Sequence, residues 1–360
     1  MKLSLPGFFG KPSVVGLDIG SSSVKALELV MAGRDKGFEL KKLGTAPLPP
    51  ESIVQGAFLN SGSIADAIRE AIGSGGITTK EVAIAVSGHS VIVKKVSLAV
   101  QGHEELADSI QWEAEQYIPF DVNEVHLDFQ ILDTSEGEGQ MDVLLVAAKR
   151  DLVDDYVQVI QEAGLIPVCI DVAAFAVENA YELNYEASPE ESVALVNVGA
   201  QVVNINVIQQ GVPAFTRDIT TGGNQYTEEI QKTLSISFED AERVKLGGKP
   251  EDQSTDVVPA EVEQAIQGVT STVVEEIGRS LDFFTATSAE SRISRVMLSG
   301  GGATISGFGD AFRERTGIEV EFMNPLSRML PSKHFDPDYL AEIAPSLSVG
   351  IGLAMRRVEQ

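Results

Sequence analysis

Residues suited to binding a phosphorylated ligand gather in one stretch near the start of the chain. Asp18 ends an apolar run and Lys25 precedes a second one. Between them lie a glycine and three serines: Gly20, Ser21, Ser22 and Ser23. A turn of small residues lets backbone N–H groups approach phosphate oxygens, while Lys25 adds a cationic donor and Asp18 is placed to hold hydrated Mg²⁺. The stretch predicts a phosphate-binding strand–turn–strand unit, although an ordinary serine-rich hairpin has the same pattern.

The same pattern returns in the second half of the chain. An apolar run over Ser192–Val196 leads into Asn197, Gly199 follows, and a second apolar run covers Val202–Ile208. The interval from Asp18 to Asn197 equals the interval from Gly20 to Gly199. Two strand–turn–strand units in one chain predict an internal duplication. This is the strongest signal that the residues alone carry.

A third group of small residues precedes a predicted helix in the second half. Gly222 and Gly223 come directly before Asn224 and the helix predicted over Gln225–Leu234. Backbone amides at a helix start form a natural site for an anion. The sequence therefore predicts a second element that contacts phosphate.

Composition limits the classes of partner. The chain has 360 residues, a formal net charge of −26 at pH 7, and 43% hydrophobic residues, enough to build proper cores. The charge argues against nucleic acid as a partner and disfavours docking on anionic lipid, because both need an excess of Lys and Arg. The one cysteine, Cys169, lies in an apolar run and is predicted to be buried, which fits a reducing cytoplasm. No stretch approaches the roughly 18 apolar residues of a membrane span, and no signal-peptide core is present.

The elements that must position these residues follow an α/β pattern. Strands are predicted within Val14–Val30 and Phe38–Pro47, and a helix over Ser63–Ile72. Residues 81–167 read as strand–strand–helix–strand–strand–helix, which predicts an inserted α+β unit rather than a stage of the main sheet. The predicted domains are a first lobe over 1–80, 168–190 and 345–360, the inserted unit over 81–167, and a second lobe over 191–344.

The motifs, in this order, resemble those of the actin-like ATPase superfamily, which includes actin, the sugar kinases and bacterial FtsA. The superfamily's first phosphate motif resembles D-x-G-[ST]-x-x-x-K, matched by Asp18, Gly20, Ser21 and Lys25. Its second is D-x-G in a duplicated hairpin, here Asn197-Val198-Gly199. The resemblance implies a duplicated actin-like, ribonuclease-H-like fold with two lobes and an FtsA-like inserted α+β subdomain.

Two further motifs extend the resemblance to the end of the chain. An A-E-x-x-K signature in the ribose-contacting helix is matched by Ala241, Glu242 and Lys245. The adenosine motif, a strand followed by G-G-G-[AS], is matched over Gly300–Ala303. Each motif is weak alone, but four in the right order across nearly the whole chain are specific.

Within the superfamily the chain most resembles the PilM family of type IV pilus assembly. The stretches that carry this resemblance are Val15–Leu29, Trp112–Phe120, Ile170–Tyr181 and Ile351–Ala354. It implies a cytoplasmic protein of pilus assembly and twitching motility that binds ATP between its lobes. It also implies a grip on the cytoplasmic N-terminal tail of a PilN-like inner-membrane protein, so that the chain reaches the inner membrane through partners. The inserted unit supplies much of that groove in the family.

Two questions about surfaces stay open at this stage. Trp112, Tyr117 and Phe120 suit either the core of the inserted unit or a binding groove. A homodimer is equally open.

The resemblance implies a role for each motif residue at an ATP site. Asp18 holds Mg²⁺ through water, and the terminal phosphates lie against Ser21, Ser22 and the turn amides, with Lys25 bridging them. The second lobe closes on the phosphates with its glycines and the sugar lies against a charged pair. The residues concerned are Gly199, Gly222 and Gly223 for phosphate, Glu242 and Lys245 for ribose, and Gly300, Gly301 and Gly302 for adenosine.

The sequence departs from the superfamily at one position that matters for hydrolysis. The second-lobe acid is Asn197 here, and an amide carries no charge to organise Mg²⁺ or to help an attacking water. Asp171 is the remaining candidate to position that water, and a helix N-cap is an equally good interpretation of it. We therefore expect firm nucleotide binding and slow or absent hydrolysis, at most a weak ATPase.

Two alternatives from other classes remain at the level of sequence. A small-molecule kinase of the same fold needs a carboxylate base and is typically longer. A filament-forming, membrane-tethering ATPase similar to FtsA carries a C-terminal amphipathic helix, and the stretch Arg356–Gln360 shows no such pattern.

Overall fold

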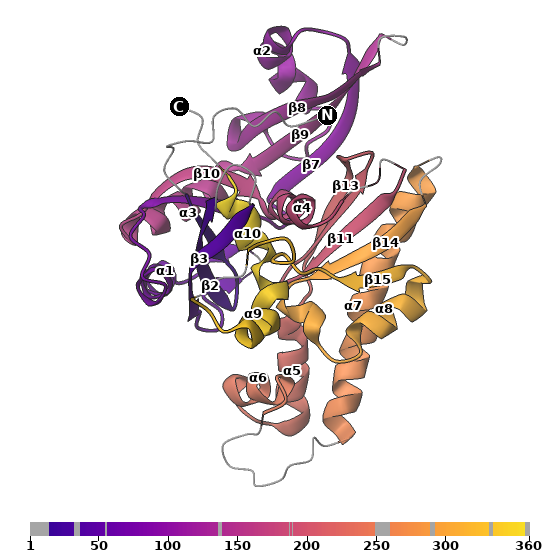
Figure 1. Ribbon diagram of the computed structural model, residues 1–360. Helices are drawn as coiled ribbons and strands as arrows, with labels where there is room; N and C mark the ends of the chain where they lie inside the picture. Colours follow the sequence, from indigo (N-terminus) through magenta and orange to yellow (C-terminus); the bar gives the residue numbers. More distant parts are fainter. Residues whose placement is uncertain are drawn as a thin grey trace.

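The computed structural model divides the chain into two lobes, each built on a five-stranded sheet, with a smaller sheet beside the first lobe (Figure 1). It describes residues 14–356 except 32–36, 55, 136–138, 187, 189, 249–259, 289–291 and 331–333. The predicted α/β class with two duplicated lobes is confirmed. The ends of the predicted first lobe, 1–13 and 357–360, lie outside the described residues.

The first-lobe sheet combines an antiparallel meander with two parallel strands. Its order is β10–β6–β1–β2–β3, in which β2 pairs antiparallel with β1 and β3, and β6 runs parallel to β1 and β10. Its strands are β1 (Val15–Ile19), β2 (Ser23–Met31), β3 (Phe38–Pro47), β6 (Glu81–Val86) and β10 (Ile166–Val172).

The second-lobe sheet repeats this topology. Its order is β13–β12–β11–β14–β15, again an antiparallel meander followed by two parallel strands. Its strands are β11 (Ser192–Val198), β12 (Val203–Gln209), β13 (Val212–Ile219), β14 (Ile293–Ser299) and β15 (Glu319–Phe322). Strand for strand, β1, β2, β3, β6 and β10 correspond to β11, β12, β13, β14 and β15.

Helices cover both faces of each sheet, and this explains the continuous apolar runs that the sequence shows. In β11, Val193 and Leu195 point into a core that the two lobes share. The alternate residues Ala194, Val196 and Val198 point into the second lobe's own core. A strand buried on both faces cannot show the polar–apolar alternation of a half-exposed strand.

Equivalent helices pack on equivalent faces of the two sheets. α1 (Ser61–Ser74) and α3 (Arg150–Glu162) cover the outer face of the first sheet, and α7 (Ala260–Thr287) and α8 (Phe308–Thr316) cover that of the second. α4 (Ala173–Asn184) and α10 (Ser348–Ala354) pack against each other between the sheets.

Glycines bring α10 unusually close to its neighbours. A Cβ on Gly352 would overlap the carbonyl oxygen of Ala176 in α4, and one on Gly16 would overlap that of Gly350. The small residues of α10 therefore serve close packing at the junction of the lobes. A 3₁₀ turn over Ala344–Leu347 precedes this helix.

The inserted subdomain is smaller than the sequence predicted. It consists of β7 (Val91–Ala99), α2 (His103–Ala114), β8 (Val125–Ser135) and β9 (Gln140–Lys149), with sheet order β7–β9–β8. The predicted unit over 81–167 is wrong at both ends, because β6 and β10 pair within the first-lobe sheet and α3 packs on that lobe. Sequence order alone hides this, since the chain leaves the sheet after β6 and returns to it at β10.

Smaller elements complete the described chain. α5 (Gly223–Leu234) and α6 (Phe238–Lys245) pack with the start of α7 and form the lower projection in Figure 1. The others are β4 (Ile53–Val54), β5 (Ala57–Phe58), α9 (Pro337–Ile343) and 3₁₀ turns over Val122–Glu124 and Gly301–Thr304. Among the described helices, none combines the length and apolar character needed to cross a membrane.

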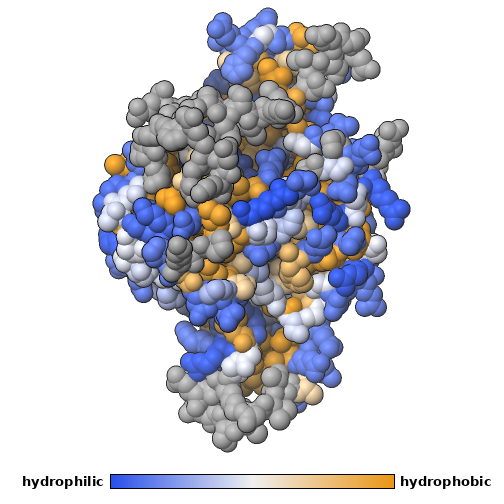
Figure 2. All heavy atoms as spheres, viewed as in Figure 1, coloured by the Kyte–Doolittle hydropathy of each residue, from blue (hydrophilic) through white to orange (hydrophobic). Residues whose placement is uncertain are grey.

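The aromatic residues of the inserted subdomain have unequal environments. Tyr117 and Phe120 pack against its core, whereas Trp112 is 73% exposed on α2. Core packing therefore explains two of the three. Cys169, predicted to be buried, is only partly so, against the shared core. Figure 2 shows hydrophilic residues over much of one face of the molecule, with hydrophobic residues between them.

Candidate functional site

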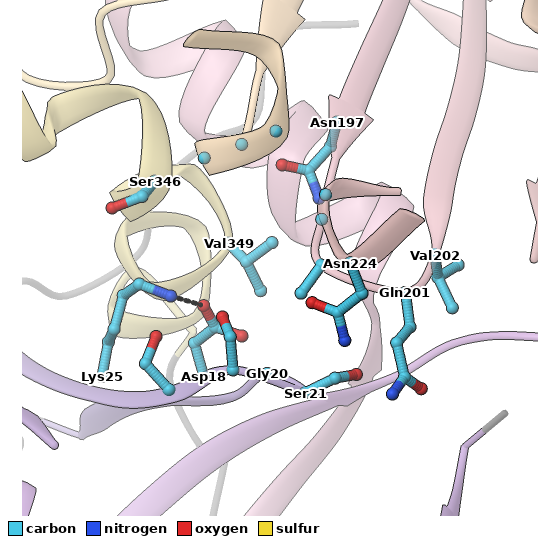
Figure 3. Close-up of a pocket in the computed structure, with 18 of the residues that line it drawn as sticks. Asp18, Gly20, Ser21, Lys25, Asn197, Gln201, Val202, Asn224, Ser346 and Val349 are labelled. Atoms are coloured by element: carbon cyan, nitrogen blue, oxygen red, sulfur yellow. Dashed lines mark hydrogen bonds and ion pairs between the residues drawn. The ribbon is translucent and has the colours of Figure 1, made fainter. Parts of the chain in front are cut away.

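A cavity of about 790 Å³ lies between the two lobes, and most of the residues singled out from the sequence line it (Figure 3). The predicted residues in its wall are Asp18, Gly20, Ser21, Ser22, Ser23, Lys25, Asn197, Gly199, Gly223, Glu242, Lys245, Gly300, Gly301 and Gly302. They come from five separate parts of the chain. Gly222 and Asp171 are not in this wall.

The first hairpin, β1–β2, presents a charged pair to the cavity. The N–H of Gly20 donates to the carbonyl of Ser23 at 3.1 Å, which closes the tight turn. Asp18 and Lys25 face each other across the strands, with Nζ 3.3 Å from Oδ2. Both side chains keep about a sixth of their surface exposed, 16% and 15%. Lys25 can therefore leave Asp18 to bind a ligand phosphate, and Asp18 can leave Lys25 to bind a hydrated metal.

The second hairpin, β11–β12, repeats the turn but not the charges. The N–H of Gly199 donates to the carbonyl of Val202 at 3.0 Å. Asn197 faces Asn204 across the strands and donates Nδ2 to its Oδ1 at 3.1 Å. Ser299 donates its hydroxyl to Asn197 Oδ1 at 3.2 Å. The second lobe thus presents two amides where the first lobe presents an ion pair.

The glycine pair before α5 serves close packing as well as any ligand. The N–H groups of Gly223 and Asn224 donate to the carbonyls of Gly199 and Ala200, at 2.9 and 2.8 Å. A Cβ on Gly222 would overlap Gly199 and lie 2.8 Å from the Ala200 oxygen. Two of the helix-start amides predicted to bind an anion are therefore engaged by the turn of the second hairpin.

Glu242 and Lys245 form one polar cluster that fixes α6 to α5. Lys245 Nζ donates to Glu242 Oε2 at 2.5 Å, to Thr227 Oγ1 at 2.9 Å and to the carbonyl of Gly223 at 3.3 Å. The Lys245 side chain is 8% exposed, and that of Glu242 is 35% exposed. Glu242 therefore has capacity to accept a hydrogen bond from a ligand hydroxyl, while Lys245 holds it in place.

The glycine run after β14 allows the backbone to cross close above β11. Gly300 has φ of +86° and donates its N–H to the carbonyl of Pro345 at 2.7 Å. A Cβ on Gly302 would lie 2.6 Å from Cγ1 of Val198. The left-handed conformation and the close approach both require glycine. The cradle that results is bordered by Thr304, Ile305 and Ser306 of the same segment.

Asp171 lies elsewhere and has a different partner. Its Oδ2 accepts a hydrogen bond from Arg356 Nε at 2.6 Å, and its Oδ1 accepts one from the N–H of Val172 at 2.8 Å. It is the penultimate residue of β10, and the N-cap of α4 is Val172, so the alternative interpretation as a helix cap is wrong. A role in positioning water stays a prediction, and the ion pair with Arg356 gives it no geometric support.

Several lining residues escaped the sequence argument. Asn204 was detectable, because the duplication that relates Asp18 to Asn197 also relates Lys25 to Asn204. Ser87 follows the buried strand β6, and polar residues at the carboxyl ends of parallel strands are common ligand contacts. Gln201, which donates to the carbonyl of Ile53 at 2.8 Å across the lobes, and Ser346 carry no comparable signal.

The duplicated lobes with a glycine-rich cavity between them define the class of actin-like proteins. The structure resembles the ethanolamine utilization protein EutJ of Carboxydothermus hydrogenoformans, with a TM-score of 0.55, 16% identity, and 97% and 91% of the two chains covered. It resembles Spiroplasma citri MreB5 bound to ADP with a TM-score of 0.50, 12% identity, and 94% of each chain covered. These likenesses show the fold.

The family within that class is shown by a closer match. A family model described as type IV pilus assembly protein PilM matches residues 16–358, so the chain belongs to this family. The structure resembles that of a PilM–PilN type IV pilus biogenesis complex with a TM-score of 0.85 and 28% identity, covering 98% of this chain and 100% of that one.

Cell division protein FtsA is a more distant relative. The chain is 23% identical to FtsA of Streptococcus pneumoniae over 360 aligned positions, covering 89% of this chain and 76% of that protein. It is 24% identical to FtsA of Pseudomonas aeruginosa, covering 65% of this chain and 60% of that protein. The chain therefore spans less than two thirds of the second FtsA, and these matches support the FtsA-related, actin-like fold.

Proposed function

We propose that the chain is an ATP-binding adaptor of type IV pilus assembly and twitching motility. In this proposal it binds the N-terminal tail of a PilN-like inner-membrane protein, and ATP acts as a conformational ligand. The observation that carries the nucleotide part is the interlobe cavity, where motif residues from both lobes converge. The partner part rests on family membership and on similarity to a PilM–PilN complex over 98% of the chain.

The donor set of the cavity fits a nucleoside triphosphate with Mg²⁺. Lys25 and the hydroxyls of Ser21 and Ser22 suit the terminal phosphates, and Asp18 suits a metal held through water. Bound Mg²⁺ would neutralise part of the phosphate charge. The first lobe thus supplies both charges that the triphosphate and its cation need.

The sugar and base ends fit the other walls. Glu242, held by Lys245, can accept a hydrogen bond from a ribose hydroxyl. Glycines at 300 and 302 let this segment lie directly on β11, where a Cβ would overlap Val198, and the backbone wall that results suits a flat adenosine. Leu246 is 76% exposed at the rim of the cavity and can cover an apolar ring.

The second lobe supports slow or absent hydrolysis. General-base help for an attacking water requires a carboxylate or imidazole within reach. Asn197 offers a neutral amide whose oxygen already accepts from Ser299, and Asp171 is paired with Arg356. Bound ATP would therefore persist and favour one arrangement of the two lobes.

The inserted subdomain is the proposed site for the tail of the membrane partner. A short tail that is disordered when free gains order on docking, by edge-strand or groove contacts. The subdomain offers a three-stranded sheet and, on α2, the exposed Trp112. In this proposal the protein lies at the cytoplasmic side of the inner membrane through its partner.

Titration calorimetry of the purified chain tests this function. MgATP is titrated first and the tail peptide second, while phosphate release is followed in parallel. Binding of both with little turnover is expected. The variant Lys25→Ala should weaken MgATP binding about 100-fold, as expected for a lost charge-assisted contact, and Lys41→Ala, an exposed lysine on β3, serves as the matched control.

Other outcomes identify the competing functions. Rapid turnover without the peptide, or phosphate transfer to sugars, would indicate an enzyme. Sedimentation of the protein alone with ATP and lipid vesicles would indicate a filament-forming protein similar to FtsA. If MgATP binds tightly and the peptide does not bind, the proposed nucleotide site stands and the proposed partner is wrong.

A further inference from the structure

A continuous chain of hydrogen bonds runs from the cavity to the base of the inserted subdomain. Asn197 and Asn204 line the cavity and are joined at 3.1 Å. Asn204 donates Nδ2 to Asp218 Oδ1 at 2.8 Å, and the N–H of Gly88 donates to Asp218 Oδ2 at 2.5 Å. Asp218 comes from β13 of the second lobe, whereas Gly88 belongs to the first lobe, so the chain crosses between lobes.

Gly88 occupies the turn through which the inserted subdomain leaves the first lobe. This turn, residues 87–90, joins the last residue of β6 to the first residue of β7. The return segment lies beside it, since the N–H of Lys149 donates to the carbonyl of Ser90 at 3.0 Å. Figure 1 shows β13 next to β7 at this point, and the two strands are in contact. Asp218 therefore holds the pivot of the subdomain from the second lobe.

The direction of every bond in this chain is determined from one end. A backbone N–H can only donate, so Asp218 Oδ2 accepts at Gly88, and Asp218 Oδ1 accepts from Nδ2 of Asn204. Asn204 must then turn its oxygen to Asn197, and Asn197 must turn its oxygen to the hydroxyl of Ser299. Reversing any one amide would place two donors or two acceptors against each other inside a buried network, which costs about 1–3 kcal/mol for each unsatisfied group.

From this geometry we infer that Asp218 is a positioning residue: it sets the orientation of the Asn204 and Asn197 amides and couples phosphate in the cavity to the pivot at Gly88. The inference rests on the proposed function, because the ligand that contacts the amides is the phosphate of the nucleotide. Asn197 and Asn204 each keep one N–H beyond those used in the chain, and phosphate oxygens accept such hydrogen bonds. A phosphate that draws on the amides shifts Asp218 and, through it, the Gly88 turn.

Burial supports the view that the carboxylate is retained for this contact. Asp218 is partly buried, and desolvation raises the pKa of its carboxyl against the opposing effect of the hydrogen bonds from Asn204 and Gly88. A carboxylate enclosed for packing alone would be replaced without loss by an apolar residue of similar size. Here both of its oxygens have donors, one on each side of the lobe boundary.

The test is hydrogen–deuterium exchange of the full chain with MgATP, MgADP or adenosine, alongside calorimetry. The variants are Asp218→Asn and, as control, Arg217→Gln, which changes an exposed neighbour on the same strand. Asn at 218 has the same shape, accepts from Gly88 and turns an NH₂ group toward Asn204, which reverses both cavity amides. Asn204→Ala interrupts the chain at a second point and serves if Asp218→Asn does not fold.

In the unaltered chain and in Arg217→Gln, MgATP should slow amide exchange in the peptide spanning residues 86–93 about tenfold, and adenosine should leave it unchanged. In Asp218→Asn and Asn204→Ala this phosphate-dependent protection should be lost, while MgATP affinity falls less than about tenfold. Equal protection in all variants would overturn the coupling. Tight MgATP binding without protection in the unaltered chain would overturn the coupling and leave the proposed function, whereas no MgATP binding would overturn both.

Discussion

The two hairpins that face each other across the cavity share a backbone and differ in chemistry. In each, a glycine N–H closes the turn on a carbonyl, at 3.1 Å in the first hairpin and 3.0 Å in the second. In each, the penultimate residue of the first strand pairs with the residue seven positions later, directly across the strands. The first pair is Asp18 with Lys25 and the second is Asn197 with Asn204.

This difference divides the work between the lobes. An ion pair that is partly exposed can release its members to a phosphate and a cation, and hydrogen bonds to charged groups are worth about 1.5–3 kcal/mol against 0.5–1.5 for neutral ones. The amide pair offers no charge but belongs to a chain of hydrogen bonds that leads away from the site. The first lobe is suited to binding, and the second to sensing what is bound.

The largest expected effect comes from removing the two equivalent residues in turn. Lys25→Ala should weaken MgATP binding about 100-fold, because a charged contact with phosphate is lost. Asn204→Ala should weaken it less than about tenfold, because only a neutral hydrogen bond is lost. Calorimetry on both variants measures the asymmetry directly. Equal losses would remove the functional distinction between the hairpins.

Introducing a charge at Asn197 should destabilise the protein, and a second substitution at Asp218 should restore the lost stability. In Asn197→Asp, Asn204 must turn its NH₂ group to the new carboxylate and its oxygen to Asp218, where two acceptors then meet. The expected loss is about 2–3 kcal/mol in the free energy of unfolding. Adding Asp218→Asn supplies the missing donor, so the double variant should recover most of it.

Urea unfolding of the two single variants and the double variant measures this coupling. Additive losses would contradict the continuous chain of hydrogen bonds. Phosphate release by the double variant is a second readout, because it carries a carboxylate at position 197. Turnover should rise above that of the unaltered chain if Asn197 is what limits hydrolysis.

A third contrast between the hairpins lies deeper in the sheets. Leu27 and Asn206 occupy equivalent places, but Asn206 donates Nδ2 to Glu178 Oε2 of α4 at 2.7 Å. Burial raises the pKa of Glu178 to about 8. The unfolded chain releases this proton near its ordinary pKa, so the stabilising effect of the protonated form is present below about pH 4.5 and is lost as the pH rises toward 8.

Glu178→Gln removes this titration while keeping an oxygen for Asn206. The variant should match the unaltered chain near pH 5 and exceed it in stability at pH 8, on the order of 2 kcal/mol. Urea unfolding across this pH range measures the difference. The control is Leu27→Met, at the equivalent apolar place, which should change stability equally at both pH values. If the stability difference between Glu178→Gln and the unaltered chain did not change with pH, Glu178 would be ionised in the folded chain.

The smallest expected contrast concerns the turn glycines. A Cβ at Gly20 would lie 3.1 Å from the Ser23 oxygen, and one at Gly199 would lie 2.8 Å from the Val202 oxygen. Gly199→Ala should therefore cost about 1 kcal/mol more than Gly20→Ala in the free energy of unfolding. Thermal unfolding of the pair measures this, and a larger cost at Gly20 would show that the first turn is the more constrained.

Sequence reasoning went furthest where spacing is local. The hairpin turns, the glycine runs and the duplication could be predicted because each depends on residues close together or on a repeated interval. It failed at the inserted subdomain, whose predicted unit began at Glu81 instead of Val91, because pairing of β6 with β1 joins residues far apart in the chain. Trp112 was similarly ambiguous, since helical spacing does not say which face of α2 is covered.

The sequence by itself determined the class of the protein, the duplication and the motif residues of the cavity wall, because these follow from residue type at fixed intervals. Only the tertiary structure decided how the polar groups pair. Asp171 faces Arg356, and Asp218, which attracted no attention in the sequence, joins both lobes at Asn204 and Gly88. The physical reason is that the role of a carboxylate depends on the donors around it, and those donors come from segments that meet only in the folded chain.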